Sequence, residues 1–450
     1  MVDLAAMRTL VQEGHTRPLA WRKQQLTRLG RLLGSIEAEL IAALASDLGK
    51  PTLEAYLELV GVRQELATAQ RQLGRWMAPR RVAMPLVQMP GKAWVQAEPL
   101  GCVLILAPWN YPLMLLLQPL VAALAAGNTA VLKPSEHTPQ VAQLIATAIA
   151  AHFEPTVVAV VQGDGAVAQT LLELPFDHIF FTGGTGIGRQ VMAAAARQLI
   201  PVTLELGGKS PCIVLDDADL PVTAKRIAWG RFLNAGQTCI APDYLLVTPA
   251  MRPPLERELI RAIEQLFGPD PSQSPDFGRL VNQRQFDRLD GLLQGAQILH
   301  GGERNREERY LAPTLVRGDP AQPLMQEEIF GPVLPIVEVA DLNAALGFIR
   351  ERPLPLALYL FGGNEAARQK LLNCSQSGSV CFNDVVLQAA IPELPFGGVG
   401  ASGLGKYHGR SGFEALSNQR AVLQRRFALD LPWRYAPYGN RLDLLKRLLG

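Results

Sequence analysis

The chain has 450 residues, of which 48% are hydrophobic and 19% charged, so it can bury the cores of two or three domains and is not globally disordered. Its 43 basic and 41 acidic side chains give a formal charge of +2, a balance that gives no reason to expect a nucleic-acid partner. The five cysteines show neither zinc-ligand spacing nor a disulfide pattern. We therefore expect free thiols, no metal site and a reducing, cytoplasmic compartment.

The N-terminus lacks a charged segment followed by an apolar run, so the sequence predicts no signal peptide. Residues 99–132 contain no charged side chain, but proline, glycine and asparagine interrupt the stretch repeatedly. A membrane-spanning helix needs about 20 mainly apolar residues without such breaks. We interpret the stretch as a buried strand, a helix and a second strand.

Apolar residues recur at helical spacing over residues 3–78, with stop signals at Gly34 and at 49–51. Two short alternating runs in 82–97 flank Pro90-Gly91, which indicates a hairpin or, alternatively, a surface loop. From residue 102 onward, runs with the apolar pattern of buried strands alternate with runs of helical spacing. Strands are predicted at 102–107, 129–133, 157–161, 178–182 and 202–206, and helices at 113–126, 139–152, 166–173 and 187–199. This order is typical of a parallel sheet with helices on both faces.

The second half continues in the same style. Strands are predicted at 212–216, 244–247, 334–339, 356–361 and 379–383, with helices between them and a polar, proline-rich loop at 268–278. The predicted fold class is therefore α/β, with two doubly wound parallel-sheet domains and a small protruding β element. A ligand is expected in the cleft at the carboxyl ends of the strands.

Three residues are candidates for covalent chemistry. Cys239 ends the small, polar segment NAGQTC (234–239), which suits an exposed nucleophile, although a small buried hydrophobe is the alternative. Glu205 lies between two leucines at the end of a strand. Three interpretations fit this position: a general base with a raised pKa, a salt-bridge partner of Lys209, or a helix cap. Asn110 in PWNYP can donate to an oxyanion, cap the following helix, or do both.

Other motifs suit a nucleotide. FTGGTGIGR (181–189) follows a strand and opens a helix, which places backbone N–H groups at a pyrophosphate; no Gly-Lys-Ser/Thr follows, which excludes a P-loop. Lys133 and Glu136 of KPSE end an earlier strand, where a glutamate favours a ribose 2′-OH over a 2′-phosphate. QEEIFGP (326–332) and LPFGGVGASG (394–403) are tight loops that, taken alone, fit ordinary turns.

Together, PWNYP, KPSE, FTGGTGIGR, LELGGKSP, GQTC, EEIFGP and PFGGVGASG resemble the aldehyde dehydrogenase superfamily in order and spacing, along nearly the whole chain. The length and the ending PFGGVGASGLGKYHGRSGFEALS look most like its class 3, or fatty-aldehyde, branch. The resemblance implies that Cys239 is the nucleophile, that Glu205 is the general base and that Asn110 joins the Cys239 N–H as oxyanion donor. It implies cofactor contacts by Trp109, Lys133, Glu136, Gly183, Gly184, Thr185, Gly188, Glu328, Phe330 and Phe396.

The implied activity is oxidation of aldehydes to carboxylic acids with NAD, or with NADP, through a thiohemiacetal and a thioester on Cys239. The expected substrates are medium or long apolar aldehydes, and the expected assembly is a homodimer. Residues 1–79 and 98–207 would form the NAD-binding domain and 208–385 the catalytic domain. Residues 80–97 and 386–450 would supply an oligomerisation hairpin, an active-site loop and the C-terminal tail.

Two alternatives remain. An acylating reductase would pass the acyl group to coenzyme A and would not need a base to activate water, so Glu205 argues against it. A silent binding protein that has kept the fold would most readily show a missing nucleophile or base. Both Cys239 and Glu205 are present.

The C-terminal tail, residues 420–450, has seven basic and two acidic side chains, a local charge of +5. One face of a predicted helix carries Leu442, Leu444, Leu445, Leu448 and Leu449, the other carries Asp443, Lys446 and Arg447, and Trp433, Tyr435 and Tyr438 precede it. Such a helix is typical of an interfacial membrane anchor and is too short to span a bilayer. The alternative is packing on the protein itself, over the substrate entrance or at the dimer interface.

Overall fold

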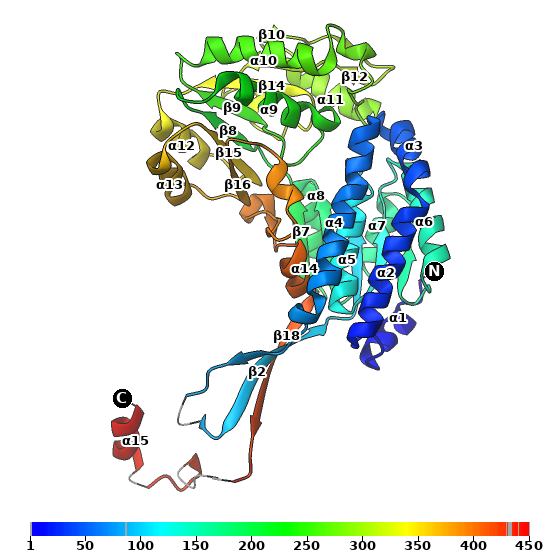
Figure 1. The fold of residues 1–450 in the computed structure, drawn as a ribbon, viewed down its shortest axis with the longest axis vertical. Helices are drawn as coiled ribbons and strands as arrows, with labels where there is room; N and C mark the ends of the chain where they lie inside the picture. The colour runs from blue at the N-terminus through cyan, green and yellow to red at the C-terminus, as the bar shows by residue number, and fades with distance from the viewer. Residues whose placement is uncertain (1, 86–87, 429, 431–433, 440, 450) are drawn as a thin grey trace.

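The computed structural model describes all residues except 1, 86–87, 429, 431–433, 440 and 450. Figure 1 shows two α/β bodies side by side, with a β arm that extends away from them and carries the C-terminus. In the part of the chain described, every helix is too short or too polar to cross a membrane. The uncharged stretch 99–132 instead supplies strands β3 and β4 and helix α5, as predicted.

The first body begins with four helices, as the apolar spacing of residues 3–78 predicted. They are α1 (Leu4–Gln12), α2 (Leu19–Ser35), α3 (Glu37–Leu48) and α4 (Thr52–Trp76). Gly49 ends α3 with a positive φ of 59°, whereas Gly34 lies in the last turn of α2. A largely continuous core joins α2, α3 and α4 to the sheet through leucines such as Leu29, Leu44 and Leu59.

The first sheet has the order β17-β7-β6-β3-β4-β5. Its parallel strands are β3 (Cys102–Leu106), β4 (Thr129–Lys133), β5 (Val158–Val160), β6 (His178–Gly183) and β7 (Val202–Leu206), connected by α5 (Met114–Ala126), α6 (Pro139–His152), α7 (Gly165–Leu172) and α8 (Thr185–Ala196). The predicted alternation is confirmed. Short β17 (Gly403–Leu404) was not predicted; it pairs antiparallel to β7, with Gly403 opposite Glu205.

The second sheet has the order β10-β13-β14-β9-β8-β15-β16, parallel except for β10. Its strands are β8 (Pro211–Val214), β9 (Tyr244–Val247), β10 (Ile298–His300), β13 (Thr314–Arg317), β14 (Val333–Glu338), β15 (Ala357–Phe361) and β16 (Ser379–Phe382). Its helices are α9 (Leu220–Phe232), α10 (Arg252–Phe267), α11 (Gln283–Leu293), α12 (Leu342–Arg350) and α13 (Glu365–Cys374). All five predicted strands are present, and the short β10 and β13 were missed. A separate hairpin joins β11 (Arg304–Asn305) to β12 (Tyr310–Leu311).

The arm consists of β1 (Arg80–Val82), β2 (Gly91–Pro99) and β18 (Ser417–Arg425). The predicted hairpin is only partly right. Strand β1 ends at Val82 and pairs with β2 over three residues, whereas β18 pairs with β2 over nine. The main partner of β2 therefore comes from the other end of the chain, which local pattern does not reveal.

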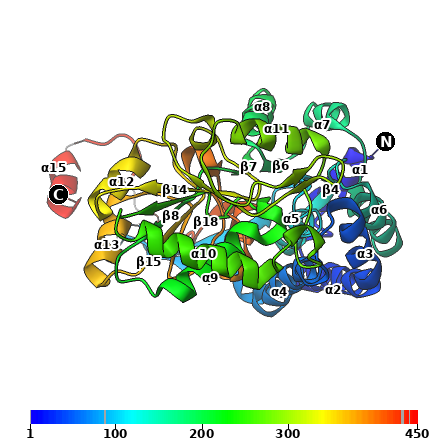
Figure 2. The same ribbon diagram turned by 90° about the horizontal axis from the view of Figure 1, so that it is seen from above.

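The chain returns to the first body through α14 (Gly409–Ala415), which packs on α5 and α4. The predicted C-terminal helix is α15 (Arg441–Leu449), where Leu442, Lys446 and Arg447 are exposed. Trp433 and the side chains of Leu444, Leu445, Leu448 and Leu449 lie outside what the structure describes. Figures 1 and 2 place α15 at the end of the arm, away from both bodies. The domain boundaries given above remain a prediction.

Candidate functional site

The segment before Cys239 has an unusual backbone. After α9, the 3-10 turn Leu233–Gly236 contains Asn234 and Ala235 with φ of 52° each and Gly236 with φ of 74°. Left-handed backbone conformations are unfavourable for residues other than glycine, and such strained residues concentrate at functional sites. A Cβ on Gly236 would collide with the carbonyl group of Gly331. Close contact with the neighbouring loop therefore requires glycine here.

Gln237 holds this turn in place. Its fully buried side chain donates from Nε2 to the carbonyl oxygens of Asn234 (2.9 Å) and Arg279 (3.0 Å) and accepts the Val281 N–H at 2.9 Å. The sequence analysis did not assign Gln237 a role. Two residues further on, the partly exposed Cys239 faces an apolar cavity.

Asn110 lies just after β3 and is 3% exposed. Its Nδ2 donates to the Gln237 carbonyl oxygen at 3.0 Å, and its own carbonyl oxygen accepts from Asn234 Nδ2 at 2.9 Å. The alternative that Asn110 caps α5 is wrong, because the N–H groups at the start of that helix donate to Glu58 Oε2, each at 3.1 Å. The fold thus brings the Asn110 amide to the cysteine turn.

A buried ion pair supports Asn110 from behind. Lys50 Nζ lies 2.5 Å from Glu58 Oε1, and it donates to the Asn110 carbonyl oxygen at 2.9 Å. The same ammonium group lies 4.3 Å above the ring of Tyr111, whose hydroxyl pairs with Thr238 Oγ1 at 2.7 Å. In the sequence, Lys50 is only part of a helix stop and Glu58 is one polar residue in a long helical pattern, so neither role was predicted.

Glu205 is 2% exposed, and neither carboxyl oxygen has a hydrogen-bond partner among the described residues. Burial raises the pKa of this carboxyl group well above its usual range, with Lys406 acting in the opposite direction. The salt-bridge alternative is wrong, because Lys209 pairs with Asp243 at 2.6 Å. A Cβ on Gly397 would lie only 2.8 Å from Glu205 Oε1, so this glycine lets the 394–403 loop close over the carboxyl group.

The Cys239 thiol shares this environment. Its burial, followed by the carboxylates of Glu328 and Glu205, raises its pKa above the usual thiol range, while hydrogen bonds from the Cys239 and Ile240 backbone act to lower it. The net upward shift favours the protonated thiol. Carboxylates close enough to affect its pKa are candidates to receive its proton.

The loop that carries Glu328 is fixed by a charged network centred on Asp243, which was not predicted from the sequence. Asp243 accepts from Lys209 at 2.6 Å, from Arg231 at 3.2 Å and from the Ile329 N–H at 3.2 Å. Burial first, and then the Asp243 charge, raise the pKa of Glu328 to about 8. A Cβ on Gly207 would collide with the Glu328 carboxylate, which explains why glycine occupies this position in the LELGGKSP segment.

The expected nucleotide residues lie in two cavities and their surroundings. One, of about 450 Å³ at the carboxyl ends of the first sheet, is lined by Trp109, Lys133, Glu136, Gly183 and Gly184. The other, of about 420 Å³, contains Thr185, Gly207 and Glu328.

Three of the expected residues take different positions. Gly188 lines neither cavity; a Cβ there would lie 2.5 Å from the Leu206 side chain, so this glycine allows α8 to pack on β7. Phe330 packs edge-on against Trp109, with ring centroids 5.4 Å apart. Phe396 lines a third cavity.

These residues fit a nicotinamide dinucleotide. Buried Thr182 Oγ1 lacks a partner among the described atoms, and Cβ positions at Gly184 and Gly186 would face open space beside the uncapped N-terminus of α8. Such a turn suits a pyrophosphate. Glu136 pairs with Lys133 at 2.8 Å. Partial burial, the largest single effect, raises the Glu136 pKa, but the hydrogen bond and charge of Lys133, a backbone hydrogen bond and His137 together outweigh it and keep the pKa below its usual range. The ionised carboxylate can accept ribose hydroxyls.

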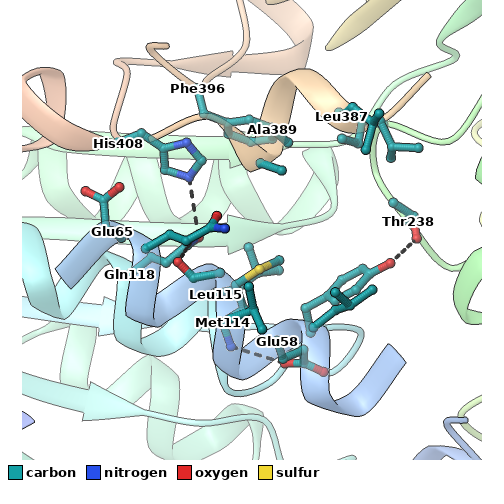
Figure 3. A pocket seen from close by; sticks show the side chains of 18 of the residues that line it. Glu58, Glu65, Met114, Leu115, Gln118, Thr238, Leu387, Ala389, Phe396 and His408 are labelled. Atoms are coloured by element: carbon teal, nitrogen blue, oxygen red, sulfur yellow. Dashed lines mark hydrogen bonds between the residues drawn. The ribbon is translucent and has the colours of Figure 1, made fainter. Parts of the chain in front are cut away.

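The third cavity, of about 380 Å³, reaches Cys239 and is mainly apolar (Figure 3). Its apolar lining comes mostly from α4, α5, α9 and the segment 386–396: Leu57, Val60, Met114, Leu115, Trp229, Leu233, Ile240, Val386, Leu387, Ala389, Ala390, Pro392 and Phe396. No group of three His, Cys, Asp or Glu within the described residues is arranged to hold a metal ion. The site as a whole combines a thiol, a buried carboxyl group, a fixed amide, a nucleotide cleft and an apolar channel.

Comparison with known proteins identifies the family that has this combination of groups. The model of the aldehyde dehydrogenase family matches residues 4–422. The 4,4'-diaponeurosporen-aldehyde dehydrogenase of Staphylococcus aureus is 43% identical, over 96% of this chain and 95% of that protein. The dimeric NADP-preferring aldehyde dehydrogenase of Rattus norvegicus is 46% identical, over 92% of each chain.

Solved structures agree. The substrate-bound state of Staphylococcus aureus AldH superposes with a TM-score of 0.96 at 40% identity, covering 99% of this chain and 98% of that one. An NAD-dependent aldehyde dehydrogenase from Sinorhizobium meliloti superposes with a TM-score of 0.87 at 31% identity, covering 96% and 88%. The chain therefore belongs to the aldehyde dehydrogenase family, and it is an NAD(P)-dependent oxidoreductase that oxidises aldehydes.

Proposed function

We propose that Cys239 is the nucleophile, Asn110 an oxyanion donor and Glu205 the general base in oxidation of medium and long apolar aldehydes. The observation that supports this most directly is the apolar cavity, which leads to Cys239 beside a fixed amide and a buried carboxyl group. Neither an acylating reductase nor a silent binding protein is favoured.

In the proposed mechanism, the Cys239 thiolate adds to the aldehyde carbonyl carbon and forms a thiohemiacetal. Asn110 Nδ2 and the Cys239 N–H stabilise the negative charge that develops on the carbonyl oxygen. The Gln237 carbonyl, to which the amide now donates at 3.0 Å, keeps Nδ2 directed at the cysteine turn. The bound nicotinamide supplies the hydride acceptor.

The second stage is hydrolysis of the Cys239 thioester. Glu205 takes a proton from a water molecule, which attacks the acyl carbon, and the thiol leaves with a carboxylic acid as product. The isolation of Glu205 from hydrogen-bond donors supports this role, because a carboxyl group with a raised pKa is a stronger base once it has ionised. The residues that would hold the dinucleotide are Trp109, Lys133, Glu136, Gly183, Gly184, Thr185 and Glu328, with Phe330 packed against Trp109. Phe396 would face the aldehyde, and Gly188 would position α8.

The apolar cavity predicts a dependence on chain length. Each methylene group that leaves water contributes about 0.8 kcal/mol, or roughly fourfold in kcat/KM, until the cavity is filled. We expect kcat/KM to rise in this way from acetaldehyde through the medium-chain n-alkanals, measured from NADH absorbance at 340 nm. A flat series would contradict the proposed substrate class, whereas absence of turnover with every aldehyde would contradict the proposed roles.

For the cofactor, we propose a modest preference for NAD over NADP. Glu136 would accept the ribose 2′-OH and repel a 2′-phosphate, while Lys133, 2.8 Å from Glu136, limits the repulsion. Glu136→Gln should shift the kcat/KM ratio toward NADP by about fivefold, the effect of one nearby charge in water. Lys133→Gln, as the matched change, should shift it toward NAD. An unchanged ratio in Glu136→Gln would remove this residue from cofactor selection.

We also propose a homodimer formed through the arm. The arm extends beyond the first body. It leaves apolar surface uncovered, because the exposed fraction is 58% for Leu423 and 39% for Val82. A second chain would cover that surface and the shallow apolar hollow beside β2. The rat relative is named as a dimeric enzyme, in keeping with this proposal.

The tail is proposed to associate weakly with anionic membrane surfaces. Helix α15 lies at the end of the arm with Lys446 and Arg447 exposed, and a tethered enzyme would meet apolar aldehydes dissolved in a bilayer. Co-sedimentation with anionic liposomes should be lost at high salt and in a chain lacking residues 432–450. Equal co-sedimentation of the full and shortened chains would contradict the proposal.

A further inference from the structure

The aldehyde cavity contains a polar cluster that the mechanism above does not use. Glu65 from α4, Gln118 from α5 and His408 just before α14 all line it. Figure 3 shows these three side chains gathered at one end of the cavity and Thr238, the neighbour of Cys239, at the other. All three are more than nine-tenths buried, with Glu65 2%, His408 4% and Gln118 5% exposed.

The hydrogen bonds of Gln118 and His408 show which of their atoms donate and which accept. Gln118 Nε2 donates to the Gly61 carbonyl oxygen at 3.3 Å, which turns Gln118 Oε1 toward His408 Nε2 at 3.4 Å. His408 Nε2 must therefore carry the proton and donate, which leaves Nδ1 as an acceptor. In the described structure this Nδ1 has no partner.

Glu65 is also only half satisfied. Its Oε1 accepts the Gly409 N–H at 2.6 Å, while Oε2 has no partner among the described atoms. Buried polar atoms are nearly always hydrogen-bonded, so two unpaired ones in a ligand cavity indicate groups that a ligand or water satisfies. Burial raises the pKa of Glu65 to about 7 and lowers that of His408 to about 4, so the imidazole is neutral and the cluster carries at most one negative charge.

The chemistry of the cluster selects among polar end groups. A carboxylate could accept from protonated Glu65 Oε2, but it has no proton to donate to His408 Nδ1 and finds no cation among the three side chains to offset the loss of its hydration. An ammonium group would have to lose its hydration in a mainly apolar cavity. A hydroxyl group carries both one donor and one acceptor, so it matches an acceptor at His408 Nδ1 and a donor at protonated Glu65 Oε2, the two unpaired atoms of the cluster.

We propose that Glu65 and His408 form a hydroxyl-binding subsite, so that the enzyme accepts apolar aldehydes that carry a hydroxyl group at the end remote from the carbonyl. The inference rests on the proposed function, because it takes Cys239 as the point where the carbonyl reacts. The distance between the two ends of the cavity then sets one preferred chain length.

The test compares each n-alkanal with the ω-hydroxyalkanal of equal chain length. At one chain length, kcat/KM for the hydroxylated substrate should exceed that for its parent by about tenfold, the effect of one net hydrogen bond. ω-Carboxyalkanals should show no such maximum. A ratio at or below one at every chain length overturns the inference, whereas n-alkanal oxidation by itself reports on the proposed function, so the two failures are distinguishable.

Variants locate the effect. His408→Asn tolerates the positive φ of 77° at this position but does not reach the hydroxyl, so the ratio should fall about tenfold, toward one. Glu65→Gln keeps an acceptor for the Gly409 N–H and a donor toward the hydroxyl, and it should retain the preference. Met114→Leu, a volume-conserving change elsewhere in the lining, should leave the ratio unchanged. A ratio unaffected by His408→Asn, or lowered equally by Met114→Leu, overturns the assignment.

Discussion

Replacing Cys239 by alanine is expected to lower aldehyde oxidation by more than about 10,000-fold, since the thiol is the only covalent centre of the proposed mechanism. Truncation removes one partly exposed sulfur atom and leaves the backbone turn, held by Gln237, intact. The variant should therefore stay folded and bind NAD with nearly unchanged affinity. Steady-state NADH formation, NAD titration by calorimetry and thermal unfolding measure the three properties.

Cys374→Ala is the matched control. This cysteine is exposed on α13 and absent from the lining of the three cavities. Its removal should leave turnover unchanged. Appreciable turnover by Cys239→Ala, or an equal loss in Cys374→Ala with the fold intact, would contradict the assignment of the nucleophile.

Replacing Glu205 by glutamine is expected to stop the reaction after hydride transfer and to lower steady-state turnover by about 100-fold to 10,000-fold. The amide has nearly the shape of the carboxyl group but cannot take a proton from water. A rapid burst of NADH, close to one per active site, should precede slow turnover in stopped-flow measurements. If the burst also disappears while NAD still binds, Glu205 instead activates the Cys239 thiol.

The wild-type pH profile follows from the direction of the Glu205 pKa shift. Burial raises that pKa well above its usual range, so the carboxyl group is protonated at low pH and must ionise to act as a base. The rate of thioester hydrolysis should therefore rise with increasing pH. Lys406 is the cation that opposes the shift, and its Nζ donates to the carbonyl oxygens of Gly378 at 3.2 Å and of Gly397.

Two variants of Lys406 test whether the rise of the hydrolysis rate with pH comes from ionisation of Glu205. Lys406→Met removes the opposing charge, so the pKa of Glu205 should rise further and the hydrolysis profile should move to higher pH. Lys406→Arg keeps the charge and should move the profile much less. Equal hydrolysis profiles in wild type and Lys406→Met would show that the rising limb belongs to a group other than Glu205.

Much of the fold was predictable because its strands are buried on both faces. Strands 129–133, 202–206 and 244–247 and helix 139–152 coincide with the predicted ranges. In each, a continuous apolar run or a helical period is bounded by turn residues, so the signal lies within a few neighbouring positions. The chemical identities of Cys239, Glu205 and Asn110 as candidates came from motifs that are equally local.

Strands that exist only through distant partners could not be predicted. Strand β18 pairs with β2, more than 300 residues earlier in the chain, and the two-residue β17 takes its place beside β7. Neither segment has an alternating pattern long enough to stand out. Their conformation depends on strand edges that the rest of the fold presents, and the pairing of β17 with β7 brings Gly403 opposite Glu205.

The sequence by itself determined the chemistry of this protein: the candidate thiol, base and amide, the glycine-rich nucleotide turn and the alternating α/β order. Only the tertiary structure decided how these groups are held and charged. Lys50 reaches Asn110 across 60 positions, Asp243 links Arg231 and Lys209 to the Glu328 loop, and the Glu65–His408 end of the cavity joins residues 343 positions apart. Those charges and unpaired atoms are buried because the two sheets and their loops pack together. That packing joins segments far apart in the chain, so no local sequence pattern predicts it.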